Sequence, residues 1–146
     1  MGNINIRDFK NEDYSQIIDL WEKTDLSNPQ RGDNLEIINK TISIGGKFLV
    51  LELTDTNQII GTSWITNDGR RLYLHHFGIH PDFQGMKYSI PLLQASLEYA
   101  KEKKLQIKLE VHKNNLKALN LYKKHSFKYL GDYEVYIIRD VEKIDV

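Results

Sequence analysis

The chain of 146 residues is 40% hydrophobic and 27% charged, a composition that suits one folded domain covering residues 1–146. Its 20 Lys and Arg residues balance its 20 Asp and Glu residues, so we expect neither nucleic acid nor a membrane as a partner. The absence of cysteine excludes disulfides, thiolate metal ligands and a cysteine nucleophile. The opening "MGNINIRDF" is too polar for a signal peptide, and no run reaches transmembrane length, so we expect a soluble, cytoplasmic protein.

The first third of the chain predicts one strand and two helices. Alternation predicts a strand over Asn3–Asp8, and Asn11 is placed to cap a helix. Asp33 and Glu36 resemble a capping box that opens a second helix, which runs to about Ile44. The first helix has an apolar face formed by Tyr14, Ile17, Ile18 and Trp21.

The middle of the chain is rich in strands. The segments "KFLVLEL", "IIGTSWIT" and "RRLYLHHFGI" each have strand composition, and "NDG" at Asn67–Gly69 is a strong hairpin signal. These patterns predict an antiparallel meander from Lys47 to Ile79.

The last third alternates between helices and strands. A helix of about four turns follows near Ser89, then a strand over Leu105–Val111, a second helix, and a hairpin of "FKYL" and "YEVYIIR" about Gly131-Asp132. The sequence therefore predicts an α+β or α/β fold with a mixed, mostly antiparallel central sheet and helices on both faces. The element order is β-α-α-β-β-β-α-β-α-β-β, and its exposed last strand favours a homodimer.

The stretch "HPDFQGMKYSIPLL", His80–Leu93, has the features of an anion-binding turn. A strand leads into it and a helix leaves it, so the free N–H groups of the helix N-terminus attract negative charge. Gly85 lets the chain turn, Lys87 adds a positive charge, and Ser89 is a good N-cap. An ordinary strand-to-helix turn with a solvated lysine explains the same residues.

The loop resembles motif A of the GNAT superfamily of N-acetyltransferases, in which a strand, a proline and a (Gln/Arg)-x-x-Gly-x-(Gly/Ala) turn precede a helix. Gln84 and Gly85 match this pattern, whereas Lys87 and Ser89 stand where the family has small residues. In that family the loop binds the pyrophosphate of acetyl-coenzyme A (acetyl-CoA). The resemblance implies that this cosubstrate is bound by Gln84, Gly85, Met86, Lys87, Tyr88 and Ser89.

A second segment, "LEVHKNNLKALNLYKKHSF", resembles the later motif of the same family, and the element order resembles the GNAT fold over essentially the whole chain. Ser126 replaces the usual glycine of this motif. The resemblance implies an acetyl-CoA-dependent N-acetyltransferase that acetylates a primary amine of a small molecule or peptide by direct attack. The alternative is a catalytically inactive CoA-binding sensor or partner subunit. The matching residues are Glu110, Asn115, Ala118, Leu121, Tyr122 and Phe127.

The family match implies a role for each of several residues. Tyr122 would protonate the departing thiolate, and Asn115, almost two helical turns earlier, would touch the same cosubstrate. A capping asparagine and a core tyrosine are the alternative readings. The main chain of Phe77, Gly78 and Ile79 would pair with the pantetheine arm like an added strand, with the N–H of Ile79 serving the thioester carbonyl.

Two residues compete for the role of general base. His75 occupies a position that resembles a catalytic histidine of arylalkylamine N-acetyltransferases, and we expect it to share a strand face with Phe77 and Ile79. Glu110 matches the glutamate proposed as base in ribosomal-protein alanine N-acetyltransferases. We expect His76 to point to the opposite face, and no metal site is predicted.

Overall fold

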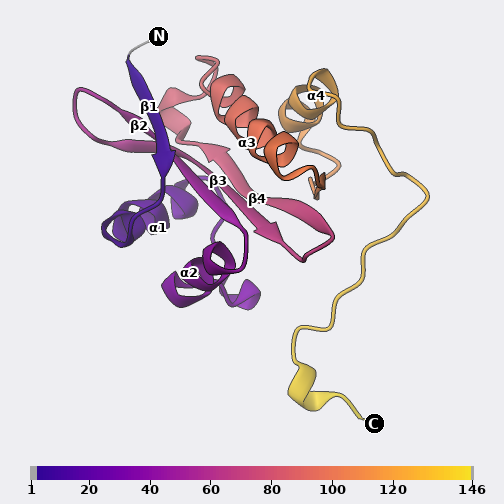
Figure 1. Cartoon of the computed structure of the whole chain (residues 1–146). Helices are drawn as coiled ribbons and strands as arrows, with labels where there is room; N and C mark the ends of the chain where they lie inside the picture. The colour runs from indigo at the N-terminus through magenta and orange to yellow at the C-terminus, as the bar shows by residue number, and fades with distance from the viewer. Residues whose placement is uncertain (1–2, 146) are drawn as a thin grey trace. The chain divides into compact units, whose positions relative to one another are not determined.

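A five-stranded sheet organises the first part of the chain in the computed structural model, which describes residues 3–145 (Figure 1). The chain forms two units, one reaching Asn28 and resuming over Asp33–Glu110, the other comprising Pro29–Gly32 and the residues from Val111 onwards. In the first unit the elements are β1 (Ile4–Asp8), α1 (Tyr14–Lys23), α2 (Leu35–Ser43), β2 (Lys47–Leu53), β3 (Ile59–Asn67), β4 (Arg71–Ile79), α3 (Ser89–Lys103) and β5 (Gln106–Leu109).

The strands lie in the order β1-β2-β3-β4-β5. Neighbouring strands are antiparallel from β1 to β4, which confirms the predicted meander, and β4 pairs with β5 in parallel. The parallel pair follows from the connection, because α3 carries the chain back along the sheet before β5 begins.

Helices cover both faces of this sheet, with α1 and α2 on one side and α3 on the other (Figure 1). Alternation along β2 supplies both layers: Phe48 and Val50 pack with α1 and α2, whereas Leu49 and Leu51 pack beneath α3. The predicted mixed sheet with helices on both faces is confirmed.

The helix caps differ from two of the sequence predictions. Asn11 lies inside a 3-10 turn (Asn11–Asp13) that leads into α1, and its side chain accepts a hydrogen bond from Asn39 Nδ2 instead of capping the helix. The cap of α2 is Asn34, whose side chain accepts from the N–H of Ile37 at 2.9 Å. The sequence predicts Asp33 as the start of this helix, and Asp and Asn are both good N-cap residues. The packed structure therefore decides which of the two neighbours, Asp33 or Asn34, caps α2.

The link from α2 to β2 is closely packed. Gly45 has a φ of 104°, and the N–H of Gly46 donates to the carbonyl of Thr41. A Cβ added at Gly46 would lie 2.6 Å from the main-chain oxygens of both Thr41 and Ile65. Only glycine fits at position 46, between α2 and β3, without displacing the main chain of either.

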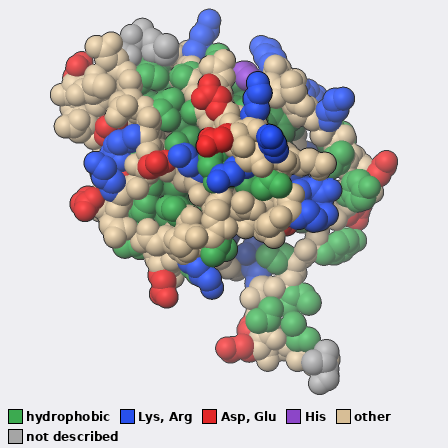
Figure 2. All heavy atoms as spheres, viewed as in Figure 1, with side chains coloured by type: hydrophobic (Ala, Val, Ile, Leu, Met, Phe, Trp, Pro, Cys, Tyr) green, Lys and Arg blue, Asp and Glu red, His purple; other side chains and the backbone are tan. Residues whose placement is uncertain are grey.

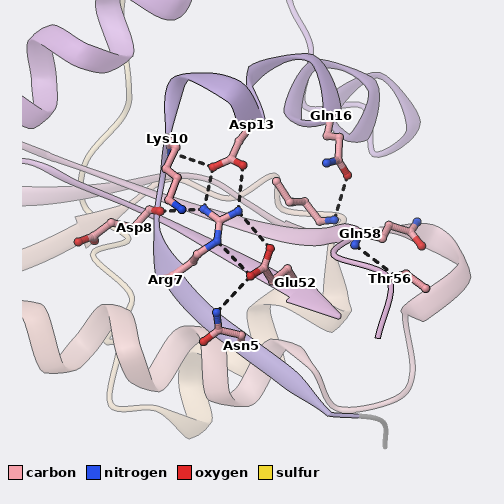
Figure 3. A network of polar contacts seen from close by, with 10 residues as sticks. Asn5, Arg7, Asp8, Lys10, Asp13, Gln16, Glu52, Thr56 and Gln58 are labelled. Carbon is pink, nitrogen blue, oxygen red and sulfur yellow. Dashed lines mark hydrogen bonds and ion pairs between the residues drawn. The ribbon is translucent and has the colours of Figure 1, made fainter. Parts of the chain in front are cut away.

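An arginine joins β1, β2 and the turn before α1 (Figure 3). Arg7 donates to both oxygens of Asp13, at 2.8 and 2.9 Å, and to both oxygens of Glu52, at 3.1 Å. Burial alone would raise the pKa of Asp13, but hydrogen bonds from Arg7 and from the N–H of Lys10 outweigh it and lower that pKa. The hydrogen bond from Arg7 also lowers the pKa of Glu52.

The second unit contains α4 (Leu116–Lys124) and two short 3-10 turns, Pro29–Arg31 and Val141–Lys143. The predicted final hairpin is wrong, because the described residues from 126 to 145 contain no strand. Strand composition alone does not form a strand, since the main-chain groups need a paired neighbour. Several apolar side chains of this segment are exposed, among them Tyr129, Tyr133, Val135, Tyr136, Ile137 and Ile138.

Acidic and basic side chains are interspersed on the face that Figure 2 shows, in keeping with the zero net charge. Within residues 3–145, no helix is both long and apolar enough to cross a membrane.

Candidate functional site

The candidate site begins where β4 extends beyond its pairing with the parallel strand β5. The ladder between β4 and β5 joins Arg71–Leu74 to Gln106–Leu109, and β4 then continues from His75 to Ile79. His75 and Glu110 each follow directly after the last pair of this ladder. The register therefore places both candidate bases at the point where the two strands part.

A β-bulge distorts β4 just beyond this point. Thr62 of β3 pairs with Gly78, and Trp64 pairs with His75, so β4 has one residue more than β3 between these pairs. His76 lies in this bulge with a φ of 45°, in the left-handed region that non-glycine residues seldom adopt.

The bulge changes which residues share a face. Beyond it, Phe77 and Ile79 pack in the cluster beneath α3. His75 lies instead beside Trp64, with ring centroids 6.0 Å apart, so the prediction that it shares a face with Phe77 and Ile79 is wrong. His76 also packs on Trp64, at 5.3 Å, and therefore does not point to the face opposite His75 as expected. The extra residue shifts the alternation by one position.

The two histidines have different surroundings. His75 is exposed, its Nε2 lies 2.9 Å from Thr66 Oγ1, and its ring stacks on Tyr73. The side chain of His76 is only 6% exposed, and its Nε2 lies 3.6 Å from Asp33 Oδ2, which forms an ion pair when the imidazole is protonated. Of the two side chains, that of His75 is the one open to solvent.

The turn after β4 has an irregular backbone to which the side chain of Gln84 is bonded. Gln84 Nε2 donates to the carbonyl of Ile79 at 2.9 Å, which ties the turn to the end of the strand. Gly85 and Lys87 both have positive φ, 80° and 65°, with exposed Met86 between them. No heavy atom lies within 4 Å of a Cβ built at Gly85, so glycine is favoured there by its backbone conformation and not by lack of space.

The N-terminus of α3 follows this turn directly. Tyr88 precedes the helix with only 3% exposure and packs beside Leu92, so its side chain belongs to the core. Ser89 is the first helical residue and not the expected N-cap. The first turn of an α-helix leaves N–H groups without intrahelical partners, and together with the helix dipole they attract an anion. In α3, Pro91 has no N–H and that of Ile90 donates to the carbonyl of Lys87, so the N–H of Ser89 is the donor that the first turn offers to a ligand.

Two further candidates lie in the second unit. Asn115 caps α4, since its Oδ1 accepts from the N–H of Ala118 at 3.3 Å. Tyr122 is 9% exposed and packs edge-on against Phe127, and burial raises its pKa to about 12. A phenol with this pKa stays protonated at neutral pH and can donate a proton or a hydrogen bond.

Sequence reasoning missed the bulge and the pair of His76 with Asp33. A bulge depends on the register between two strands, so the alternation within β4 carried no signal for it. Asp33 was interpreted as a helix cap, a role that its neighbour Asn34 takes. Among residues 3–145, no three His, Asp or Glu side chains gather closely enough to share a metal ion.

The fold is that of a known family. The profile of the Acetyltransferase (GNAT) family matches residues 8–127, so this chain belongs to the GNAT family of acetyltransferases.

Solved structures agree with the fold. An acetyltransferase of Streptococcus agalactiae 2603 is 19% identical, with 96% of this chain and 94% of that chain covered and a TM-score of 0.78. A GNAT-family acetyltransferase of Staphylococcus aureus Mu50 is also 19% identical, with 90% and 89% covered and a TM-score of 0.77. A predicted acetyltransferase of Clostridium acetobutylicum, solved with acetyl-CoA, is 19% identical, with 92% and 96% covered and a TM-score of 0.71.

Proposed function

We propose that the protein is an N-acetyltransferase that transfers the acetyl group of acetyl-CoA to a primary amine of a small molecule or peptide. The observation that carries this proposal is the turn from Gln84 to Ser89, in which two left-handed residues lead from the end of β4 into the N-terminus of α3. Family membership supports acetyl transfer, and the similar Clostridium acetobutylicum structure with acetyl-CoA supports the choice of cosubstrate.

The diphosphate of acetyl-CoA binds to this turn in the proposed complex. The N–H of Ser89 at the start of α3 donates to a phosphate oxygen, and the exposed Lys87 adds a charge-assisted contact. The bond from Gln84 to the Ile79 carbonyl holds the turn at the end of β4. The pantetheine arm then runs along the main chain of Phe77–Ile79, beyond the last β4–β5 pair.

The chemical step is a direct attack of the amine on the thioester carbonyl. A C–N bond forms and the C–S bond breaks, the base takes the proton that the amine loses, and Tyr122 protonates the departing thiolate. Burial keeps Tyr122 protonated for this role. With no cysteine in the chain, a cysteine acyl-enzyme is excluded, which favours attack within a ternary complex. Asn115 contacts the cosubstrate in this proposal, as the family motif implies.

The base is His75 or Glu110, and variants separate them. The two variants are His75→Gln and Glu110→Gln. The one that replaces the base lowers kcat/KM by about 10²–10⁴-fold, and the one that replaces the other residue lowers it less. The pH profile of kcat/KM is a second test, because its ascending limb lies at higher pH for an imidazole base than for a carboxylate base. If the His75→Gln variant kept full activity and an unchanged profile, His75 would be excluded.

Two measurements on the unmodified protein test the proposal. Acetyl-CoA at a hundredfold excess over its Kd adds about 2.7 kcal/mol to the free energy of unfolding, which a melting scan detects. Release of free CoA thiol in the presence of a panel of primary amines then identifies turnover and the acceptor. No thermal shift would contradict acetyl-CoA binding, and binding without turnover by any amine would indicate a sensor or partner subunit.

A further inference from the structure

A buried chain of hydrogen bonds holds the bulge of β4. Trp21 Nε1 donates to Thr62 Oγ1 at 3.0 Å, and Thr62 Oγ1 donates to the carbonyl of His76 at 2.7 Å. The direction of both bonds is unambiguous, because an indole N–H only donates and a carbonyl only accepts. The single hydroxyl proton of Thr62 is therefore donated to the His76 carbonyl in the bulge. Thr62 is fully buried and Trp21 is 3% exposed, so water does not compete for either bond.

These two hydrogen bonds hold a strained part of the backbone, at His76. A non-glycine residue seldom adopts the left-handed region, and such a residue persists only where its surroundings fix it. The ring of His76 lies 4.2 Å from that of Trp21, and its carbonyl is held by Thr62. One tryptophan thus contacts the His76 ring directly and bonds to the hydroxyl that holds the His76 carbonyl.

The position of the bulge connects it to the cosubstrate. It lies between the end of the β4–β5 ladder at Leu74 and the segment Phe77–Ile79, whose main chain pairs with pantetheine in the proposed function. A change in the orientation of the His76–Phe77 peptide would turn the N–H and C=O groups that follow it.

We propose that Thr62 is a positioning residue for acetyl-CoA: its hydroxyl fixes the bulge so that the main chain of Phe77–Ile79 faces the pantetheine arm. This inference rests on the proposed function. Thr62 itself lies on β3, the strand that pairs with the bulged part of β4, and acts only through the His76 carbonyl.

The neighbouring residue offers a matched control. Ser63 is also fully buried on β3, and its hydroxyl lies 2.6 Å from Ser96 Oγ of α3. Its side chain bonds toward the helix on the other face of the sheet, away from the His76 carbonyl. Ser63→Ala therefore removes a buried hydroxyl bond from the same strand without releasing the bulge.

The experiment measures acetyl-CoA affinity by calorimetry and the melting temperature for Thr62→Val, Thr62→Ser and Ser63→Ala. Thr62→Val is expected to weaken acetyl-CoA binding about tenfold, which corresponds to about 1.4 kcal/mol, the size of one buried hydrogen bond. Thr62→Ser keeps the hydroxyl and binds like the unmodified protein. Ser63→Ala lowers the melting temperature but leaves the affinity unchanged.

Other outcomes overturn the proposal. A folded Thr62→Val protein with unchanged affinity would show that the hydroxyl does not position the strand, and an equal loss of affinity in Ser63→Ala would show a general effect of destabilisation. If Thr62→Val fails to fold, Thr62→Ala leaves room for a water molecule to satisfy both polar groups, and it must still bind acetyl-CoA several-fold more weakly. Absence of binding by the unmodified protein would instead contradict the proposed function itself.

Discussion

Replacing Lys87 by glycine should separate strain from binding in the anion-binding turn. Lys87 has a φ of 65°, which costs a non-glycine residue about 1–2 kcal/mol. Glycine removes this cost but loses more freedom on folding, by about 0.5–1 kcal/mol. The free energy of unfolding of Lys87→Gly should therefore rise by up to about 1.5 kcal/mol. The same change removes a charge-assisted phosphate contact of about 1.5–3 kcal/mol, so the Kd for acetyl-CoA should increase about 10- to 100-fold.

Denaturant unfolding without ligand measures the first effect, and calorimetric titration with acetyl-CoA at two salt concentrations measures the second. Lys87→Ala is the matched control, because it removes the charge but keeps a Cβ in the left-handed region. It should weaken binding as much as the glycine variant and gain no stability. The salt dependence of binding should decrease in both variants, since each removes one cation from the site.

Two results would refute this reasoning. Unchanged acetyl-CoA affinity in both variants would show that the Lys87 ammonium does not contact the diphosphate. A lower unfolding free energy for Lys87→Gly than for Lys87→Ala would show that the strain at this residue is smaller than the conformational freedom that glycine loses on folding.

Three further predictions concern other parts of the molecule. Tyr122→Phe should lower kcat by about 10²-fold or more and leave the Kd for acetyl-CoA nearly unchanged in titrations, and equal turnover would remove Tyr122 from the mechanism. Gly46→Ala should cost about 2 kcal/mol or more in denaturant unfolding, because its Cβ would meet two main-chain oxygens at 2.6 Å, and an unchanged midpoint would contradict this. Arg7→Met should lose about 2 kcal/mol near neutral pH. Because Arg7 lowers the folded-state pKa of Asp13 and Glu52, its contribution is complete above about pH 5 and is lost as the pH falls through their folded pKa values. The deficit of the variant should therefore shrink in acid, and a constant deficit across the pH range would refute the linkage.

Much of the fold was predictable from local patterns. The strands β2, β3 and β4 follow from period-two alternation and from the turn at Asn67–Gly69, which bring neighbouring segments together with little chain between them. The helix α3 follows from the apolar spacing after Ser89, and the parallel β4–β5 pair follows from the helix between them. The turn from Gln84 to Ser89 was recognisable because its strand, proline, glycine and helix lie consecutively.

Local patterns do not decide features that depend on how separate segments meet. The bulge at His76 arises from the register of β4 against β3, and it separates His75 from Phe77 and Ile79, which alternation predicts on the same face. Asp33 and Asn34 are both residue types that cap helices well, so the sequence does not decide between them. In the packed structure Asn34 caps α2. The segment "YEVYIIR" has strand composition but forms no strand in the described residues, since a strand exists only through its pairing with another. The sequence alone therefore determined the order of elements as far as α4 and singled out the turn from Gln84 to Ser89, whereas tertiary pairing decided the backbone geometry of the strand that leads into that turn.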